Sequence, residues 1–326
     1  MSQSIISNYP AGFANGVTVR GMPLMQTHPG RVYWVYNGTT GLLAGQRGGS
    51  DGNRGTFDSP FATVTYAFTQ CVANRGDIIM IKPGHAENLN ATTLLGTWNI
   101  AGVAVVGLGS GTNRPTFTVI TANTATITVS AANISVQNCV FIANFLSIAA
   151  CFTLTTAREF TVQNCYFLDT SSTLNFLNIV KSTGAANTVD GLSFCDNLVK
   201  NLCVTSNNST ILTANDIDRL TLCRCNLNWA IQNDIAAGIT VTAGVLTNLD
   251  CGWNKVYRPN TQTSTGGSLI TVGGTTSTGW VYNNYVQTLD TSSDLLFTTT
   301  VGLGAFENRV TGVVGATGFV IPAVDS

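Results

Sequence analysis

Val136-Gln-Asn-Cys139-Val-Phe141 is the first of seven copies of one short phrase, and the spacing of these copies decides the fold. In each copy a Cys or Asn is followed by any residue and then by Val, Phe or Leu. This Cys or Asn recurs every 24 to 32 residues, a period that is typical of a solenoid whose coils are single supersecondary units. The other copies are Val162-Gln-Asn-Cys165-Tyr-Phe167, Phe194-Cys-Asp-Asn197-Leu-Val199, Leu222-Cys-Arg-Cys225-Asn-Leu227, Cys251-Gly-Trp-Asn254-Lys-Val256, Val281-Tyr-Asn-Asn284-Tyr-Val286 and Ala305-Phe-Glu-Asn308-Arg-Val310.

The residues around each phrase have the composition of β-strands. Val, Ile, Thr, Phe and Tyr dominate, and apolar residues alternate with polar ones. Further β-rich runs lie between the phrases, joined by Gly, Ser, Asn and Thr. Two or three short strands per coil predict an all-β, right-handed parallel β-helix, in which each strand pairs with its equivalents about 4.8 Å above and below. The runs are 126–129, 152–155, 239–242, 269–272 and 296–300.

The Cys or Asn of each phrase is predicted to belong to one structural ladder, because stacked coils place equivalent residues over one another. Cysteine suits the inward side of a strand as a small, soft hydrophobe. Asparagine suits a bend, where its side chain bonds to the backbone and unusual dihedral angles are tolerated. The ladder comprises Cys139, Cys165, Asn197, Cys225, Asn254, Asn284 and Asn308.

The segment 1–46 does not fit the repeat and is predicted to be an extended N-terminal arm. It holds apolar residues among prolines and glycines, without an obvious core of its own. Two interpretations stay open: the arm folds back along the solenoid, or it docks on another subunit. The residues expected to make such partner contacts are Tyr9, Phe13, Val17, Val19, Met22, Leu24 and Met25.

The segment 47–326 is predicted to be one β-helix domain with a cap at each end. Ser59 followed by proline is a helix start signal, and apolar residues at helical spacing predict a capping helix near 60–73. The tail 311–326 is expected to cap the last coil or to lie between subunits, because an uncovered strand edge promotes aggregation. The apolar face of the helix comprises Phe61, Val64, Phe68, Cys71 and Val72.

Composition argues against several partner classes. Only 10% of the 326 residues are charged and the net charge is −1, so no basic footprint for nucleic acid or an anionic membrane is present. No run approaches the roughly 20 apolar residues of a membrane helix. The N-terminal residues lack a secretion signal, so synthesis and assembly in the cytoplasm are expected. The nine cysteines are an odd number and fall mostly on strand phrases, so free, buried thiols are expected.

No constellation of catalytic residues is apparent, and no cofactor is expected. Asp216 and Asp218 share a strand face, but a solvated turn is the preferred interpretation. His28 and His85 lack a nucleophile signature and are expected in turns or in packing. Other carboxylates on different coils could still converge in space, which the sequence leaves open. They are Asp169, Asp190, Asp196, Asp250, Asp290 and Asp294.

Two segments have some resemblance to metal sites, but no metal is expected at either. The segment 51–55 resembles the start of a calcium loop, yet the distal Glu is missing, so a glycine turn is preferred. Cys223 and Cys225 are expected to point to one face. No His or CxxC pair completes a zinc site with them, so two packed thiols are preferred.

The segments Asp58-Ser-Pro-Phe-Ala-Thr-Val-Thr-Tyr-Ala67 and Gly76-Asp-Ile-Ile-Met-Ile-Lys-Pro-Gly84, with Glu87, carry a family resemblance. They resemble the cap and first coil of right-handed parallel β-helix proteins of the pectin-lyase-like superfamily. Together with the seven phrases, the resemblance covers about 50–315; it is specific for the fold and says little about function. The whole chain is also similar to small β-helix proteins encoded by tailed bacteriophages, which are virion components.

The second resemblance implies a structural function without enzyme activity. It favours a capsid decoration (cement) protein on the virion surface. Such a protein is expected to be a homotrimer whose arm contacts the major capsid protein or neighbouring virion subunits. The alternative is a tailspike-like or tail-fibre-like protein that binds or depolymerises a host glycan.

Overall fold

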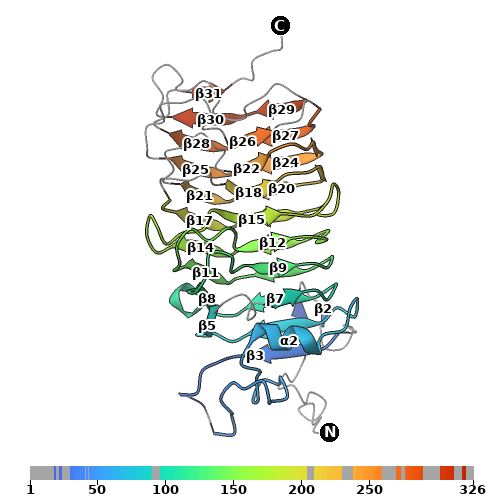
Figure 1. The fold of residues 1–326 in the computed structure, drawn as a ribbon, viewed down its shortest axis with the longest axis vertical. Coiled ribbons are helices and arrows are strands. Elements are labelled where there is room, and N and C mark those ends of the chain that lie inside the picture. The colour runs from blue at the N-terminus through green and yellow to red at the C-terminus, as the bar shows by residue number, and fades with distance from the viewer. Residues whose placement is uncertain are drawn as a thin grey trace, which may run out of the picture.

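The computed structural model shows an all-β chain folded into a parallel β-solenoid, which confirms the predicted fold class. The coils stack along the long axis of the molecule from the N-terminal to the C-terminal end (Figure 1). The structure describes residues 18–19, 22–23, 30–40, 42, 44–89, 96–203, 209–229, 238–258, 269–272, 276–288, 302–311 and 318–320. The predicted strand 296–300 and the predicted partner-binding side chains of the arm lie outside the described residues.

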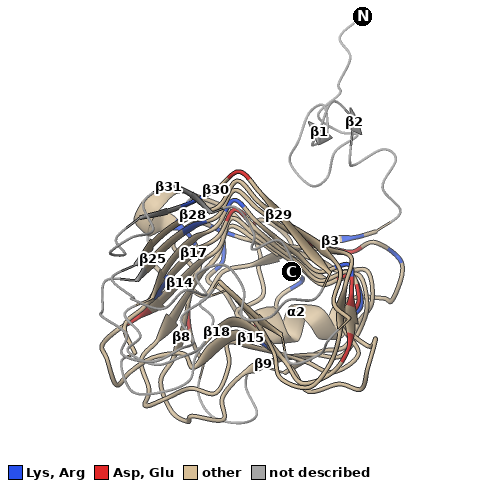
Figure 2. Ribbon diagram, turned by 90° about the horizontal axis from the view of Figure 1, so that it is seen from above, with Lys and Arg blue, Asp and Glu red and all other residues tan. Residues whose placement is uncertain are grey.

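Three sheets form the sides of the solenoid, and successive coils add one strand to each (Figure 2). Sheet 1 contains β3 (Val32–Val35), β4 (Ile78–Ile81), β7 (Ala104–Gly107), β10 (Ser135–Gln137), β13 (Thr161–Gln163), β16 (Ser193–Cys195), β20 (Thr221–Cys223), β24 (Leu249–Gly252), β27 (Gly279–Tyr282) and β29 (Leu303–Phe306). Sheet 2 contains β5 (Ala86–Leu89), β8 (Thr116–Val119), β11 (Val140–Ala143), β14 (Tyr166–Asp169), β17 (Leu198–Asn201), β21 (Asn226–Trp229), β25 (Lys255–Arg258), β28 (Tyr285–Thr288), β30 (Asn308–Thr311) and β31 (Gly318–Val320). Sheet 3 contains β6 (Thr97–Trp98), β9 (Ile127–Val129), β12 (Phe152–Leu154), β15 (Asn178–Ser182), β18 (Ser209–Thr213), β22 (Ile239–Val241) and β26 (Ile270–Val272).

Smaller elements lie at the corners and the N-terminal end. The short strands β19 (Ile217–Asp218) and β23 (Leu246–Thr247) pair in parallel, in the connections from sheet 3 to sheet 1. The strands β1 (Thr18–Val19) and β2 (Met22–Pro23) pair antiparallel, and a short 3-10 helix, η2 (Gly111–Asn113), precedes β8.

The register of the strands matches the seven phrases. In sheet 2, Phe141 pairs with Phe117 below and with Phe167 above. Because side chains alternate between the two faces of a strand, these rings all point inward and stack in one column. The ring centroids lie 5.4 Å apart for Phe117 and Phe141 and 5.2 Å apart for Phe141 and Phe167. Phe194, from β16 of sheet 1, packs on Phe167 with its ring tilted and the centroids 5.6 Å apart. This aromatic column forms the centre of the core.

The capping helix is shorter than predicted. The helix α2 spans Val64–Gln70, whereas 60–73 was expected. Thr63 is the N-cap, and its hydroxyl accepts a hydrogen bond from the amide of Tyr66. Phe61 is still extended, where it bridges to β3, and Val72 is 49% exposed beyond the helix end.

The helix still covers the N-terminal end of the core. The ring of Phe68 stacks on Trp98 with centroids 4.9 Å apart, and Trp98 in turn contacts Phe152. Viewed along the solenoid, α2 lies within the outline of the three sheets (Figure 2). Asp51 fixes its start, because the carboxylate accepts hydrogen bonds from the amides of Ala62 and Thr63. This use of Asp51 agrees with the preferred interpretation of segment 51–55 as a turn.

At both ends of the solenoid, segments that were predicted to lie outside the coils contribute strands to the sheets. The strand β3 lies within the predicted arm 1–46, yet it pairs in parallel with β4 as the first strand of sheet 1. At the other end β31 pairs antiparallel with β30, so part of the tail 311–326 adds a strand beyond the last coil. That strand covers the edge which β30 would otherwise present.

The bend between sheet 1 and sheet 2 is built differently from the prediction. The asparagines of the phrases were expected to adopt the unusual dihedral angles, but in every phrase the residue before the Cys or Asn does so. Its φ angle lies in the left-handed region, between 51° and 62°, in all seven phrases. The residues are Asn138, Asn164, Asp196, Arg224, Trp253, Asn283 and Glu307. This single left-handed residue turns the chain sharply from one sheet into the next.

Candidate functional site

The seven ladder residues lie inside the solenoid at this bend, and each is at most 2% exposed. The asparagines bond to the coil below. The side-chain oxygen of Asn254 accepts from the amide of Cys225 (3.0 Å), and its side-chain nitrogen donates to the carbonyl of Leu222 (2.9 Å). Asn284 and Asn308 repeat both bonds one and two coils further on. Because these groups are buried, the ladder joins coils and offers no surface to a ligand.

Cysteine fills the same position because it also supplies one donor and one acceptor. The thiol of Cys225 donates to the carbonyl of Phe194 (3.3 Å), and its sulfur faces the amide of Asn197. Cys165 makes the equivalent contacts with the carbonyl of Val136 and the amide of Cys139. Burial raises the pKa of the Cys165 and Cys225 thiols to about 12, so both keep the proton that they donate.

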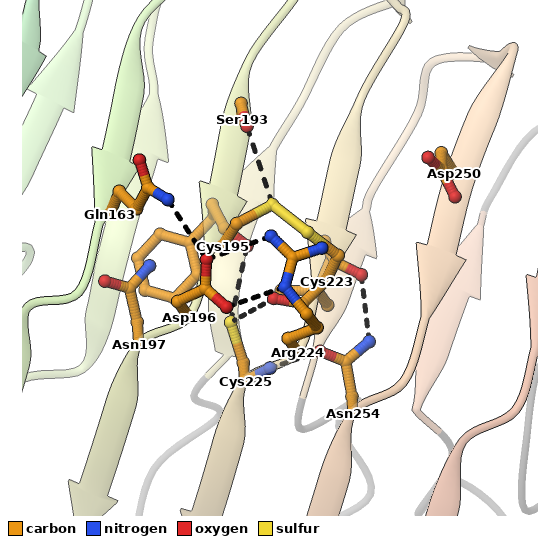
Figure 3. The surroundings of a disulfide bond; sticks show 12 residues. Gln163, Ser193, Cys195, Asp196, Asn197, Cys223, Arg224, Cys225, Asp250 and Asn254 are labelled. Carbon is orange, nitrogen blue, oxygen red and sulfur yellow. Dashed lines mark hydrogen bonds and ion pairs between the residues drawn. A yellow bond between two sulfur atoms is a disulfide. The ribbon is translucent and has the colours of Figure 1, made fainter. Parts of the chain in front are cut away.

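The expectation of nine free thiols is wrong. Cys195 and Cys223 form a disulfide, with Cα atoms 4.6 Å apart, on the outer face of sheet 1 (Figure 3). The two residues are paired in register on β16 and β20. Cys225 does not share a face with Cys223, because the left-handed residue Arg224 lies between them and turns Cys225 inward. The other seven cysteines are free and buried.

Replacing Cys195 and Cys223 with serine is expected to lower the free energy of unfolding by about 3–4 kcal/mol. The bridge spans 28 residues, and closing a loop of that length restricts the unfolded chain by about this amount. Urea unfolding of the double variant and the wild type measures the difference. Reductant should lower the stability of the wild type only. Thiol counting in denaturant without reductant should give seven sites, and nine would mean that the bridge is absent.

The carboxylates at the corner between sheet 3 and sheet 1 serve the turns. Asp216 accepts from the amide of Val245 (2.8 Å), and Asp218 accepts from the Thr247 hydroxyl (2.7 Å). Arg219 bonds to Glu159 (2.6 Å) and to Asp218 (3.3 Å). The turn interpretation of Asp216 and Asp218 is therefore preferred over a catalytic pair. Among the described residues, no three His, Cys, Asp or Glu side chains gather as a metal site.

His85 and Glu87 meet at the N-terminal end of sheet 2. The Nε2 atom of His85 lies 3.1 Å from Glu87, and the imidazole packs against Phe117. His85 is 1% exposed, which places it in the core as a packing residue. His28, Asp290 and Asp294 lie outside the described residues. In the described part of the chain, no helix is long and apolar enough to cross a membrane.

Asp169 is a buried carboxyl at the end of β14. Its two oxygens accept from the amides of Phe176 and Leu202, both at 2.9 Å, and so join consecutive coils. Burial raises the pKa of Asp169 to about 7, against the lowering effect of these two amides. An exposed aspartate titrates near pH 4, so between about pH 4 and 7 the folded protein holds a proton that the unfolded chain has lost.

Stability is therefore expected to fall as the pH rises through this window, by about 1.4 kcal/mol for each unit by which the pKa is raised. Urea unfolding at pH 5 and pH 8 measures the change. Asp169→Asn should remove this part of the pH dependence, whatever its effect on stability at one pH. Equal slopes for the variant and the wild type would show that Asp169 titrates in the ordinary range.

The surface feature that the sequence analysis missed is a group of exposed aromatic residues on the last coils. Eight large hydrophobic side chains are exposed among the described residues, and five of them lie between residues 253 and 306. Single exposed hydrophobic side chains are normal on protein surfaces, but several that lie close together mark a candidate interaction site. The five are Trp253, Tyr257, Trp280, Tyr285 and Phe306.

A shallow hollow lies on the outer face of sheet 1 within this group. It has a volume of about 320 Å³ and opens to solvent. Trp280 is 59% exposed and Phe306 is 42% exposed, and their ring centroids are 5.8 Å apart at an angle of 69°. Tyr282 stacks on Phe306 at 5.1 Å, with the rings only 7° from parallel. The lining residues are Leu249, Asp250, Trp280, Tyr282 and Phe306. We call these five residues the aromatic platform.

Two glycines allow the rings to lie against the sheet. A Cβ atom added to Gly304 would stand 2.3 Å from the Trp280 ring, and one added to Gly252 would stand 2.5 Å from the Tyr282 ring. Both glycines belong to neighbouring coils, paired in register with the aromatic residues. Each ring therefore fills the space left by a missing side chain.

One carboxylate adjoins the platform. The hydroxyl of Tyr282 donates to Asp250 Oδ1 (2.8 Å), and this bond raises the pKa of Tyr282. Arg224 is engaged nearby, because it holds both oxygens of Asp196 at 2.7 and 2.9 Å. That ion pair lowers the pKa of Asp196, which also accepts from Gln163 (Figure 3). The site thus combines flat apolar rings with a small number of placed polar groups, as ligand sites do.

Comparison with known proteins gives distant structural matches. No family model matches this chain, and no curated protein sequence matches it. A solved structure of a rhamnogalacturonan lyase aligns with a TM-score of 0.41 and 14% identity, over 88% of this chain and 86% of its own. The pectate lyase Pel9A aligns with a TM-score of 0.28 and 13% identity, over 87% and 78%. Both names are those of polysaccharide lyases, and nothing about this chain is inferred from matches this distant.

Proposed function

We propose that this protein binds a polysaccharide on the aromatic platform, at the outer face of sheet 1. The observation that carries the proposal is the pair of exposed rings, Trp280 and Phe306, beside the carboxylate of Asp250. Sugar rings present flat faces of C–H groups, which pack on aromatic faces, and an edge of hydroxyls, which donate to carboxylates. The platform offers both kinds of partner within one hollow.

The size of the hollow favours a small ligand segment over a protein partner. Its volume of about 320 Å³ lies at the lower end of the range for small-molecule sites, roughly 300–1,000 Å³. A stable protein interface requires about 800 Å² from each partner, with many contacts around a packed centre. A short segment of a polysaccharide can occupy the platform without burying a surface of that size.

We propose binding rather than cleavage. Glycosidic cleavage by acid and base needs two carboxyl groups, one of them protonated with a raised pKa. Near the platform, Asp196 has a lowered pKa because of Arg224, so it stays ionised and cannot donate a proton. Asp250 accepts the Tyr282 hydroxyl instead of facing a second carboxyl. These contacts support a lectin-like surface.

Trp280→Ala is expected to weaken glycan binding at least tenfold, because the ring supplies the most exposed flat face of the platform. Affinity electrophoresis in capsular polysaccharide and in lipopolysaccharide gives the dissociation constant. Trp253→Ala is a matched control, since Trp253 is 58% exposed but does not line the hollow. Equal retardation of both variants and the wild type would reject the platform. Released oligosaccharides would show that the protein is an enzyme.

A structural function in a bacteriophage virion is the second candidate. The buried asparagine ladder supports it, since continuous bonding between coils is suited to a stiff building block. Under this proposal the chain is a homotrimeric capsid decoration protein, and residues 1–46 attach it to the major capsid protein. Light scattering tests the trimer. Co-sedimentation with undecorated capsids, with and without residues 1–30, tests the attachment.

A further inference from the structure

We infer that the aromatic platform selects a neutral sugar ring and discriminates against uronic acids. This inference rests on the proposed glycan-binding function and specifies its ligand. Three features carry it: the angle between the rings, the acceptor character of the polar group, and the pairing of the neighbouring cation, Arg224.

The rings of Trp280 and Phe306 give the hollow two apolar surfaces with different orientations. Trp280 meets Phe306 at 69°, while Tyr282 and Phe306 are nearly parallel at 7°. A planar, apolar ligand would need one flat surface only. A pyranose ring has an apolar face and a thickness of its own, so it can rest on the indole while its edge contacts Phe306.

The polar groups of the hollow, Asp250 and Tyr282, accept hydrogen bonds, and neither carries a positive charge that would bind an anion. Asp250 Oδ1 is used by Tyr282, and Oδ2 has no hydrogen bond within the described part of the chain. An ionised carboxylate is an acceptor only, so its partner must be a donor such as a sugar hydroxyl. The Tyr282 hydroxyl, whose hydrogen is donated to Asp250, can accept a hydrogen bond from a second sugar hydroxyl through its oxygen. Neighbouring hydroxyls of one sugar ring fit this pair.

In the described part of the chain, the cation next to Tyr282 is Arg224, and it is already paired. Arg224 is held in a two-bond ion pair by Asp196, which uses the fork geometry that would otherwise recognise a carboxylate. A uronate at the platform would also stand close to the charge of Asp250, and like charges repel. The electrostatics therefore favour a neutral glycan over a polyuronate.

The experiment compares oligosaccharides of equal length. Isothermal titration with hexamers of neutral glucose and galactose units, and with hexagalacturonate, gives the affinity of each at low and moderate salt. We expect a neutral hexamer to bind at least tenfold more tightly than hexagalacturonate. Asp250→Asn should weaken binding of the neutral hexamer about tenfold. The ratio of the neutral to the uronate affinity should also decrease, because the variant loses the charge of Asp250 but keeps the shape of its side chain.

Gly304→Ala provides a second variant that retains every ring. The added Cβ would displace the Trp280 indole from the sheet, so neutral binding should fall as it does in Trp280→Ala. Melting curves confirm that each variant is folded, and Trp253→Ala should bind as the wild type does.

The outcomes separate the two proposals. If no hexamer and no polysaccharide binds, the proposed function fails. If hexagalacturonate binds as tightly as the neutral hexamers, and Trp280→Ala abolishes that binding, the proposed function stands and the neutral selectivity is overturned. Neutral binding that is unchanged in both Trp280→Ala and Gly304→Ala would reject the platform as the binding site, and with it the proposed function.

Discussion

Phe167→Asp is expected to abolish folding. Phe167 is 1% exposed, stacks on Phe141 at 5.2 Å, and packs against the tilted ring of Phe194 from sheet 1 at 5.6 Å. Removing a buried phenylalanine costs about 3–5 kcal/mol, and a buried, unpaired carboxylate costs several more. The sum reaches the roughly 5–15 kcal/mol by which single domains are stable. Circular dichroism of the variant should show no cooperative melting transition, and most of the protein should be insoluble.

Leu168→Asp is the matched control, because it places the same charge one residue further along β14. Leu168 points to the outer face of sheet 2, where it is partly exposed. This variant should fold, with a melting temperature within a few degrees of the wild type. A soluble Phe167→Asp protein that melts as the wild type does would mean that the inward column of sheet 2 has been misassigned.

The sequence predicts this part of the fold well because period and alternation are local signals. The phrases repeat at intervals that match the length of one solenoid coil. The residues two positions after Cys139 and Cys165 are both phenylalanine. Stacking therefore follows from the alignment of the phrases alone. The pairing of Phe141 with Phe167 confirms it.

Alternation misleads at the bend, and the thiols show why. Cys223 and Cys225 are two residues apart, which predicts one face if the strand continues. The left-handed residue Arg224 ends the strand between them, so Cys223 stays outside and Cys225 turns inward. The signal that identifies the disulfide lies in the comparison of neighbouring coils, not in the spacing along one strand. Cys195 and Cys223 occupy the second position of neighbouring phrases, and stacked coils bring that position together.

The aromatic platform was missed for a related reason. Its parts are unremarkable when the chain is read in order, because Gly252 and Tyr282 are 30 residues apart. Aligned phrases place Gly252, Tyr282 and Phe306 in the same second position, as the pairing of β24, β27 and β29 shows. A glycine next to an aromatic residue in such a column indicates a ring lying on the sheet. The bond between Tyr282 and Asp250 depends on side-chain conformation, which no spacing rule supplies.

Asn254→Ala is expected to lower the free energy of unfolding by about 2–6 kcal/mol. The change leaves the amide of Cys225 and the carbonyl of Leu222 without the bonds that Asn254 makes at 3.0 and 2.9 Å. Each buried backbone group left unpaired costs about 1–3 kcal/mol. Urea unfolding, followed by circular dichroism, measures the loss. Asn226→Ala is a control, since Asn226 is an exposed asparagine on β21.

Asn254→Cys should recover much of this loss, and this comparison tests the ladder itself. In the wild type Cys225 faces the amide of Asn197 and donates to the carbonyl of Phe194, as an asparagine would at that position. A thiol at 254 can make the same two contacts with the coil below, although sulfur bonds are weaker than amide bonds. The predicted order of stability is therefore Asn, then Cys, then Ala. Equal stability of the Cys and Ala variants would mean that the column is held by packing volume, and that its donors and acceptors contribute little to the joining of the coils.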